Sequence, residues 1–172
     1  TLFPYTTLFR SKENTSYDCD IVSNPEFLKQ GAAVQDFLKP DRVILGAKNE
    51  RALKIMREIY DPFIRTGIPV IEMDIKSAEM TKYAANAFLA LKISYANEIA
   101  NICEAIGANS EMVRRGMCAD NRIGSKFLFA GLGYGGSCFP KDVKALISVA
   151  KANGYSAEIL NATDNINLRQ RY

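Results

Sequence analysis

The sequence predicts an α/β segment followed by an all-α domain that contains one unusually long helix. Short apolar runs alternate with one helix-like segment up to residue 75. From residue 76 the pattern of residues changes, and residues 77–106 contain neither glycine nor proline. We therefore expect an α/β part over 12–75 and a helical domain over 76–172.

Composition narrows the classes of protein to consider. The chain has 172 residues, of which 48% are hydrophobic, and its net charge is +3. No long basic run favours nucleic acid, and no apolar run is long enough to span a membrane. No signal peptide is visible, so we expect a cytoplasmic protein. The four cysteines are scattered and histidine is absent, which predicts no metal site and excludes Ser–His or Cys–His catalysis.

The first eleven residues look foreign to the fold. Residues 1–11 match, codon for codon, the translation of a common sequencing-library adapter. We interpret them as an artefact and exclude them from fold reasoning; the alternative is a natural apolar N-terminus. On the first interpretation, the α/β part begins in the middle of a domain.

The α/β part contains short segments typical of strands and one segment typical of a helix. We expect strands over 20–23, 41–46 and 69–73, and a helix over 50–64. Glu26 follows the first strand, at the end where ligands sit in open α/β sheets. It can be a general base, a ligand contact or a solvated loop charge, and the residues alone favour the solvated charge.

The long helix is expected over 77–106, with Ser77 as its cap and Gly107 at its end. Its expected apolar face comprises Met80, Tyr83, Ala84, Ala87, Phe88 and Leu91. A helix of this length spans about 45 Å, which is typical of helices packed between domains or subunits. Lys82 and Asn86 lie one turn apart on it. They can aim two donors at one oxygen, but a snorkelling lysine and a stray amide are the simpler interpretation.

The remaining elements lead to a cysteine. Shorter helices are expected over 110–117 with Ser110 as cap, over 140–152 and over 156–169, with a turn at 120–123. Gly131-Leu-Gly-Tyr-Gly-Gly looks like a dinucleotide fingerprint, but it lacks the preceding strand and the later acidic residue, so we reject it. Cys138 stands between this turn and a helix start at Pro140. The helix dipole and Lys141 favour its thiolate, yet a small buried cysteine remains an alternative.

Four motifs together resemble the nucleotide-sugar 6-dehydrogenases, the UDP-glucose/GDP-mannose dehydrogenase family. They are Asn24-Pro-Glu-Phe-Leu, Lys82-Tyr-Ala-Ala-Asn86, Asn121-Arg-Ile-Gly124 and Gly135-Gly-Ser-Cys-Phe-Pro-Lys-Asp142. The resemblance implies that 12–75 is the C-terminal part of a Rossmann-type NAD-binding domain. It implies that 76–172 is the central dimerisation and catalytic domain, similar to the C-terminal domain of 6-phosphogluconate dehydrogenase.

The resemblance also implies a reaction. The family oxidises the C6 alcohol of the sugar to a carboxylate with two NAD⁺ and one water. Cys138 is then the nucleophile that forms a thiohemiacetal and a thioester. Lys82 and Asn86 stabilise the C6 oxygen, Glu26 orients or deprotonates the hydrolytic water, and Asp142 supports the lysine and the water.

Further contacts are implied residue by residue. Arg122 is expected to reach substrate in a neighbouring subunit of a homodimer formed through the helix 77–106. Gln30 and Lys141 are expected near NAD, although the family usually has glutamate where this chain has Gln30. The full set of expected substrate contacts is Glu26, Phe27, Leu28, Lys29, Gln30, Lys82, Asn86, Arg122, Phe127, Leu128, Phe129, Ala130, Gly131 and Gly135.

The substrate implied is UDP-glucose, because relatives specific for GDP-mannose tend to have leucine in place of Phe139. GDP-mannose, UDP-N-acetylmannosamine and a non-catalytic dimerisation module remain alternatives. Because no accepted dinucleotide fingerprint occurs in the sequence, we expect these 172 residues alone to be inactive.

Overall fold

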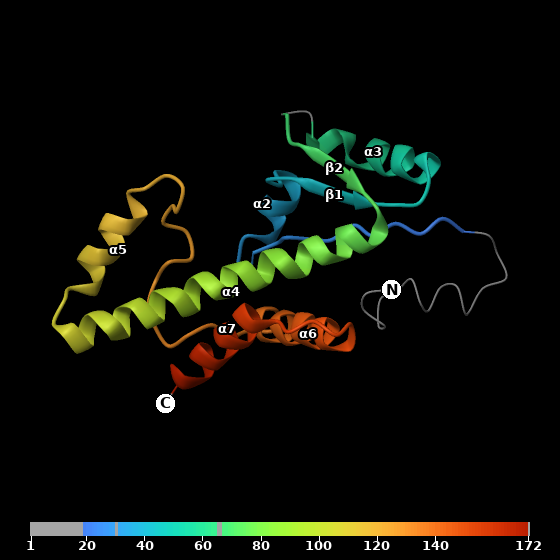
Figure 1. Cartoon of the computed structure of the whole chain (residues 1–172). Coiled ribbons are helices and arrows are strands. Elements are labelled where there is room, and N and C mark those ends of the chain that lie inside the picture. Colours follow the sequence, from blue (N-terminus) through green and yellow to red (C-terminus); the bar gives the residue numbers. More distant parts are fainter. Residues whose placement is uncertain (1–18, 30, 65–66, 172) are drawn as a thin grey trace. The chain divides into compact units, whose positions relative to one another are not determined.

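The computed structural model describes residues 19–29, 31–64 and 67–171 of the chain (Figure 1). The chain divides into two compact units, with the boundary between Lys82 and Tyr83 inside helix α4 (Ile75–Ile106). The artefact expected over 1–11 lies outside the described residues, as does Gln30. Within the described ranges, no helix has both the length and the apolar character needed to cross a membrane.

The first unit contains a parallel strand–helix–strand arrangement. Strands β1 (Val43–Gly46) and β2 (Val70–Met73) pair in parallel, with Val43 opposite Val70. Helix α3 (Glu50–Ile64) connects them, as parallel strands require. All four residues of β1 are buried. These elements confirm the two predicted strands, each shortened at its start, and the predicted helix with its expected bounds.

Two features of the first unit differ from expectation. The strand predicted over 20–23 is wrong, because only an isolated antiparallel bridge joins Ser23 to Gly46. Pairing cannot continue normally past Asn24, since Pro25 has no N–H to donate. Helix α2 (Ala33–Leu38) was not predicted. Val34, Phe37 and Leu38 have helical spacing, but six residues that bury none of their side chains are too short for this spacing to predict a helix.

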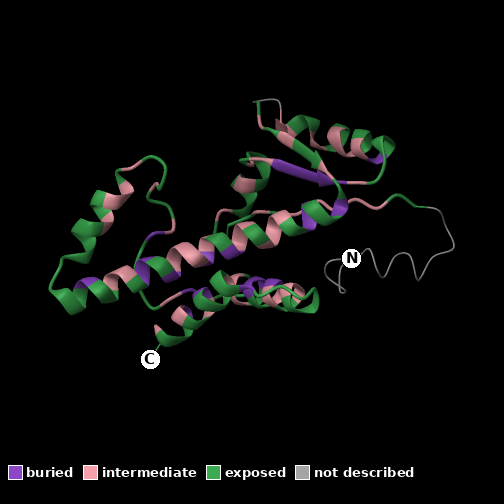
Figure 2. Ribbon diagram, viewed as in Figure 1, coloured by how far each residue is buried: buried purple, intermediate pink, exposed green. Residues whose placement is uncertain are grey.

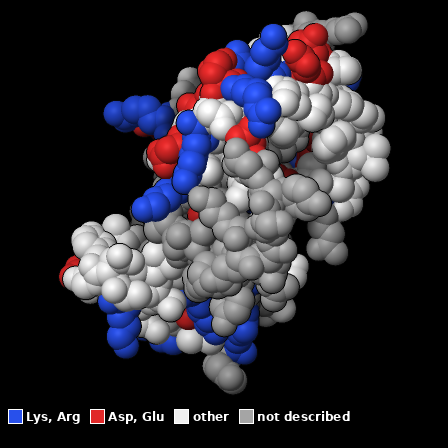
Figure 3. Space-filling view, turned by 90° about the vertical axis from the view of Figure 1, so that its right-hand side faces the viewer, with Lys and Arg blue, Asp and Glu red and all other residues white. Residues whose placement is uncertain are grey.

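Charged side chains in this unit pair with opposite charges. Arg57 bonds Glu72 at 2.9 Å, and Arg51 bonds Asp20 at 2.6 Å. The hydrogen bond from Arg51 lowers the pKa of Asp20. In the upper part of the face shown in Figure 3, acidic and basic side chains of the described residues are likewise interspersed. Mixed charges of this kind fit the small net charge of the chain.

The start of α4 packs against the end of β1. Asp74 accepts hydrogen bonds from Ser77 N at 3.0 Å and Ser77 Oγ at 2.6 Å, so Asp74, and not the predicted Ser77, supplies the capping carboxylate. These bonds lower the pKa of Asp74. A Cβ atom at Gly46 would lie 2.5 Å from the Ala78 Cβ and 3.0 Å from the Asp74 oxygen. Only glycine therefore permits this close approach.

The second unit is built from α4 from Tyr83 onward and three further helices, α5 (Ser110–Cys118), α6 (Phe139–Ala152) and α7 (Glu158–Arg169). The predicted helices are confirmed, with starts displaced by at most two residues for α6 and α7. The cap of α5 is Asn109, whose side chain accepts a bond from Met112 N, and not the predicted Ser110. The core of the second unit contains Ala87, Ala90, Tyr134, Val143 and Leu146.

Buried positions recur along α4 (Figure 2), but the predicted apolar face is wrong in part. Ala87 and Ala90 face the core, and so do the polar residues Ser94 and Asn97, both at 0% exposure. Phe88, by contrast, is 60% exposed. Tyr95 and Ile102 follow it at intervals of seven residues and are also exposed. Such spacing places the three side chains along one exposed stripe.

Replacing Gly46 by alanine is expected to destabilise the first unit. The added methyl group meets Ala78 and backbone atoms that have little freedom to move, so we expect a loss of about 1–3 kcal/mol in the free energy of unfolding. Urea denaturation followed by circular dichroism measures this. The matched control is Gly116→Ala in α5, where the new Cβ meets nothing within 4 Å and should be neutral or stabilising. Equal transitions for Gly46→Ala and the parent chain would contradict the packing argument.

Candidate functional site

The loop that carries Glu26 is anchored by Asn24. The Asn24 amide donates to the Ile44 carbonyl at 2.9 Å and accepts from the Tyr60 hydroxyl at 2.6 Å. One side chain thereby ties the loop to both β1 and α3. Pro25 then fixes the backbone angle of the next residue. Glu26 therefore projects from an anchored loop just beyond the buried strand.

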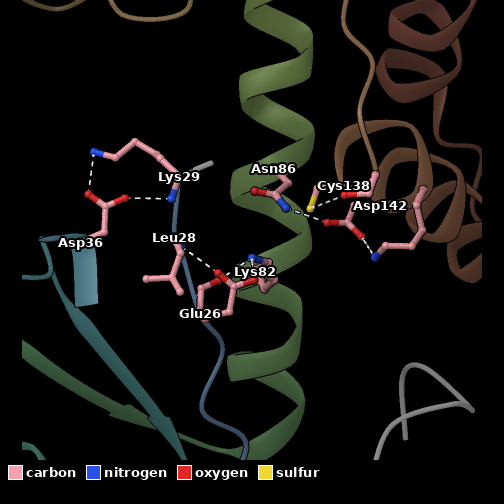
Figure 4. Close-up of polar contacts among 10 residues, drawn as sticks. Glu26, Leu28, Lys29, Asp36, Lys82, Asn86, Cys138 and Asp142 are labelled. Carbon is pink, nitrogen blue, oxygen red and sulfur yellow. Dashed lines mark hydrogen bonds and ion pairs between the residues drawn. The ribbon is translucent and has the colours of Figure 1, made fainter. Parts of the chain in front are cut away.

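Glu26 and Lys82 form an ion pair within the first unit (Figure 4). Lys82 Nζ lies 2.8 Å from Glu26 Oε1 and also bonds the Glu26 carbonyl. The other carboxylate oxygen accepts the Leu28 N–H at 2.7 Å. The residues alone favour a solvated loop charge at Glu26, whereas the structure pairs Glu26 with Lys82. The Lys82 side chain is only 19% exposed and the Glu26 side chain is 58% exposed.

A half-exposed ion pair of this kind is easily rearranged. Coulomb attraction near solvent contributes only about 0–1 kcal/mol to stability. The Phe27 ring lies 5.5 Å from Lys82 Nζ and 3.8 Å from the Arg42 guanidinium carbon. The lysine is therefore supported on one side by an aromatic face while its partner is open to water. The pair can exchange contacts when an oxygen-rich ligand arrives.

Asn86 and Asp142 form a second polar pair, within the second unit. Asn86 Nδ2 donates to Asp142 Oδ2 at 2.6 Å, and Asp142 is 1% exposed. Its other oxygen bonds the neighbouring ammonium of Lys141. That bond raises the pKa of Lys141, against the opposing effect of partial burial. Asp142 thus has a partner on each oxygen, as a buried carboxylate requires.

Cys138 lies at the N-terminal end of α6, immediately before its first residue. Its carbonyl accepts the Asp142 N–H at 2.8 Å, which is the first bond of the helix. The thiol is free and exposed, with Sγ 3.7 Å from the Ser137 hydroxyl. The positive end of the helix dipole therefore points at an accessible sulfur. Exposure removes the alternative of a small buried cysteine.

Aromatic rings fix the start of α6 from the N-terminal side. The Phe139 ring lies edge-on to Phe127 at 6.1 Å and to Tyr134 at 6.2 Å. Phe127 has φ of 64°, a left-handed conformation that is strained for a bulky residue. Leu128 is buried, whereas Phe129, Ala130 and Gly131 are exposed. The residues from Phe129 to Gly131 are therefore open to solvent.

Among the described residues, the others implied by the resemblance are surface groups. Arg122 is 90% exposed at its side chain and bonds Asp120, whose pKa it lowers. Lys29 pairs with Asp36 at 3.1 Å. Leu28 is 41% exposed, and Gly135 is also exposed. Gln30 lies outside the described residues.

Lys141 fits a role beside an anionic cofactor such as NAD. Its side chain is 64% exposed even though Nζ bonds Asp142. Its ammonium also lies 5.6 Å from the Tyr83 ring centre. An exposed ammonium at the start of α6 is suited to meet a phosphate. Among the described residues, no three or more cysteine, aspartate and glutamate side chains gather in a way that could hold a metal ion.

Sequence reasoning missed a set of amide side chains that bond the glycine-rich segment. These are Asn97, Asn167 and Gln170, which contact the backbone of Gly131 or Tyr134. Their signal in the sequence is faint. Asn97 falls on the helical spacing of the buried residues Ala87 and Ala90, and a polar residue at such a position needs an internal partner.

Comparisons with known proteins agree with the motifs. Residues 76–169 match the central domain of the UDP-glucose/GDP-mannose dehydrogenase family, and residues 5–64 match its NAD binding domain. A UDP-glucose 6-dehydrogenase of Pseudomonas aeruginosa is 54% identical over 88% of this chain and 33% of its own length. The enzyme AglM of Haloferax volcanii, a UDP-glucose 6-dehydrogenase, is 53% identical over 86% of this chain and 35% of its own length.

Solved structures give the same result. A UDP-glucose dehydrogenase from Pyrobaculum islandicum superposes with a TM-score of 0.87 at 40% identity, covering 92% of this chain and 36% of that one. A UDP-D-ManNAc dehydrogenase from Pyrococcus horikoshii gives 0.82 at 26% identity, covering 97% of this chain and 40% of that one.

The chain thus spans about a third of the length of its curated relatives. It combines the end of an NAD-binding α/β domain with a central helical domain, as the motifs predict, and NAD is the cofactor that the matched domain implies. Because the central-domain match alone covers more than half of the residues, the chain belongs to the UDP-glucose/GDP-mannose dehydrogenase family.

Proposed function

We propose that the chain is part of a UDP-glucose 6-dehydrogenase that oxidises UDP-glucose to UDP-glucuronate in two NAD-dependent steps through Cys138. The observation that carries the proposal is the exposed thiol of Cys138 at the N-terminus of α6, inside the segment that matches the central domain. The high identity to enzymes named UDP-glucose 6-dehydrogenase supports the substrate. We infer that the 172 residues alone do not complete the reaction.

The proposed chemistry balances at the C6 carbon. NAD⁺, when bound, supplies the hydride acceptor for both oxidations. Loss of a hydride and a proton from the C6 alcohol gives the aldehyde, to which the Cys138 thiolate adds to form a thiohemiacetal. Loss of a second hydride and the hydroxyl proton gives a thioester. Water then cleaves the carbon–sulfur bond, so that the carboxylate leaves and the cysteine is restored.

The polar pairs serve this chemistry in different ways. In our proposal, Asp142 fixes the Asn86 amide through one N–H, which leaves the second N–H to donate to the C6 oxygen. Lys82 has three donors, and two of them bond Glu26. The third can meet the same oxygen and exchange its proton. Glu26 acts on the hydrolytic water; because Gln30 cannot be a base, that task falls to Glu26 alone.

Binding follows from the same residues. We propose that the backbone from Phe127 to Gly131, together with Gly135, lines the sugar-nucleotide site. Gln30 and Lys141 approach NAD. Arg122 reaches substrate in a neighbouring subunit, and its exposed side chain fits that role. The exposed stripe on α4 forms the contact between the two subunits of a homodimer.

Two alternatives to this function remain. The likeness to a UDP-D-ManNAc dehydrogenase supports a sister enzyme with another nucleotide sugar, such as UDP-N-acetylmannosamine or GDP-mannose. Higher identity to the UDP-glucose enzymes favours the first proposal. A non-catalytic dimerisation module is the alternative of another class. It needs the helical core but neither the thiol of Cys138 nor the polar pairs.

Replacing Cys138 by alanine separates an enzyme from a module. In a protein extended to the length of the relatives, we expect Cys138→Ala to reduce UDP-glucose-dependent NADH formation on the order of a thousandfold or more, since the nucleophile is lost. Absorbance of NADH measures the rate. The control is the exposed Cys19, whose change to alanine should leave the rate within about twofold. Absence of NADH from any nucleotide sugar with the unmodified protein would refute the enzyme proposal.

Changing Asn86 to aspartate tests the fixed amide. The substitution sets a second carboxylate against buried Asp142, and the repulsion raises the pKa of the introduced carboxyl in the folded state. The penalty should be about 3 kcal/mol near neutral pH and should shrink as the pH falls toward the unfolded carboxyl pKa of about 4, because protonation relieves the repulsion. Urea unfolding at several pH values measures it. Exposed Asn165→Asp on α7 is the control, expected to change stability by less than about 0.5 kcal/mol. A penalty independent of pH would count against the contact.

The proposed subunit contact predicts an effect of Phe88→Glu. Charge on the exposed stripe of α4 should raise the dissociation constant of the homodimer about tenfold or more, because a large apolar contact is lost and a carboxylate is buried. Sedimentation velocity over a range of protein concentrations measures the equilibrium. Ile55→Glu, at a 50% exposed position on α3, is the matched control. Equal association of both variants would remove the stripe from the interface.

A further inference from the structure

The backbone before Cys138 is held by side chains and not by other backbone. Residues 129–134, all of them described, take part in no backbone-to-backbone hydrogen bond. Backbone polar groups that lack such partners need side chains or water. Asn97, on α4, accepts the Gly131 N–H at 2.7 Å through Oδ1. Gln170, the residue that caps the C-terminus of α7, donates to the Gly131 carbonyl at 3.1 Å.

Tyr134 is bonded in the same manner by Asn167 of α7. Asn167 Oδ1 accepts the Tyr134 N–H at 2.7 Å, and Asn167 Nδ2 donates to the Tyr134 carbonyl at 3.1 Å. Arg171 donates to the same carbonyl at 2.9 Å. Asn167 is 2% exposed, so this two-point contact is shielded from water. Asn97 and Gln170 with Asn167 therefore bond both polar groups of Gly131 and of Tyr134.

Gly133 lies between the two bonded residues and fits closely under Asn167. Its φ is +91°, and a Cβ there would lie 2.4 Å from Asn167 Oδ1. A side chain at this position would expel the Asn167 amide. Glycine at position 133 thus leaves room for an amide side chain on a helix more than thirty residues later in the chain.

Tyr134 connects these hydrogen bonds to Cys138 through its packing against the next residue, Phe139. The Tyr134 side chain is 4% exposed and belongs to the core of the second unit. Burial raises the pKa of its hydroxyl far above the usual value. Its ring lies edge-on to Phe139 at 6.2 Å, and Phe139 directly follows Cys138. Fixing Tyr134 therefore limits the movement of the residues that begin α6.

We propose that Asn97, Asn167 and Gln170 form an amide clamp whose three members are positioning residues for the glycine-rich segment, 131–136. The clamp sets the backbone that faces the nucleotide sugar and the thiol of Cys138, and no member touches the reacting atoms. The link to catalysis rests on the proposed function. The proposal that these hydrogen bonds fix the segment does not rest on that function. An experiment can therefore refute the link to catalysis without refuting the clamp.

Asn167→Asp is the sharpest variant, because it keeps the size and the Oδ1 acceptor but replaces the donor by an oxygen. Facing the Tyr134 carbonyl, that oxygen repels where Nδ2 bonds. We expect amide hydrogen exchange at Tyr134 and its neighbours to quicken about tenfold or more. Exchange of the 172-residue chain, resolved by peptide and mass spectrometry, measures this. Asn165→Asp adds the same charge at an exposed position of α7 and should leave the segment protected.

A second variant guards against simple misfolding. Gln170→Ala removes the bond to the Gly131 carbonyl and leaves the Asn167 contact in place. It should quicken exchange around Gly131 more than around Tyr134, a local pattern that general destabilisation does not produce. Protection of 131–136 unchanged in both variants, or lost equally over α6 and α7, would overturn the clamp.

Kinetics of the extended protein test the link to catalysis. We expect Asn167→Asp to raise KM for UDP-glucose about tenfold and to leave KM for NAD⁺ within about twofold, because the displaced backbone faces the sugar nucleotide. A structural role alone would lower the amount of active enzyme with both KM values unchanged, and this result would overturn the positioning role. If Cys138→Ala retains full activity, the proposed function fails, while the exchange measurements still decide the clamp.

Discussion

A carboxylate that has almost no access to water sets the strictest constraint on the second unit. Asp142 is 1% exposed, so both of its oxygens need hydrogen-bond donors within the protein. Asn86 supplies one donor from α4, and Lys141 supplies the other from the first turn of α6. Since the Asp142 N–H also bonds the Cys138 carbonyl, the buried carboxylate belongs to the first turn of the helix that follows the thiol. The backbone of the cysteine is therefore bonded to the same residue whose buried side chain joins α4 to α6.

Much of the fold was predictable, because its elements have strong local signals. Helix α3 has the expected bounds, and β1 and β2 lie inside the predicted strands. Several of the errors concern choices that depend on single hydrogen bonds or on packing partners. Asp74 and Asn109 displace Ser77 and Ser110 as caps because several polar residues stand side by side and only geometry decides between them. The exposure of Phe88 shows the same limit, because hydrophobic periodicity does not state which side of a long helix is covered.

The candidate site was predictable to a different degree. Cys138 has a local signal in the glycines before it and the helix after it. Glu26 and Lys82 have none that separates them from ordinary surface charges, and only the four motifs taken together indicated a shared role. The amides of the clamp had no motif at all, since Asn167 contacts Tyr134 across thirty-three positions of sequence. Side chains that bond irregular backbone follow tertiary structure, which neither periodicity nor propensity encodes.

The two polar pairs differ in burial, and this difference matters for the proposed reaction. A group that must stay in one place gains from burial, because a shielded bond such as Asn86–Asp142 is costly to break. A group that must exchange a proton or orient a water gains from exposure, because a weak pair such as Lys82–Glu26 can change partners. The amide to which we assign the C6 oxygen thus bonds a buried carboxylate, whereas the lysine and the carboxylate to which we assign proton transfer share a contact open to water. A dimerisation module needs no such division between fixed and exchangeable groups, so their contrast in burial itself favours an enzyme.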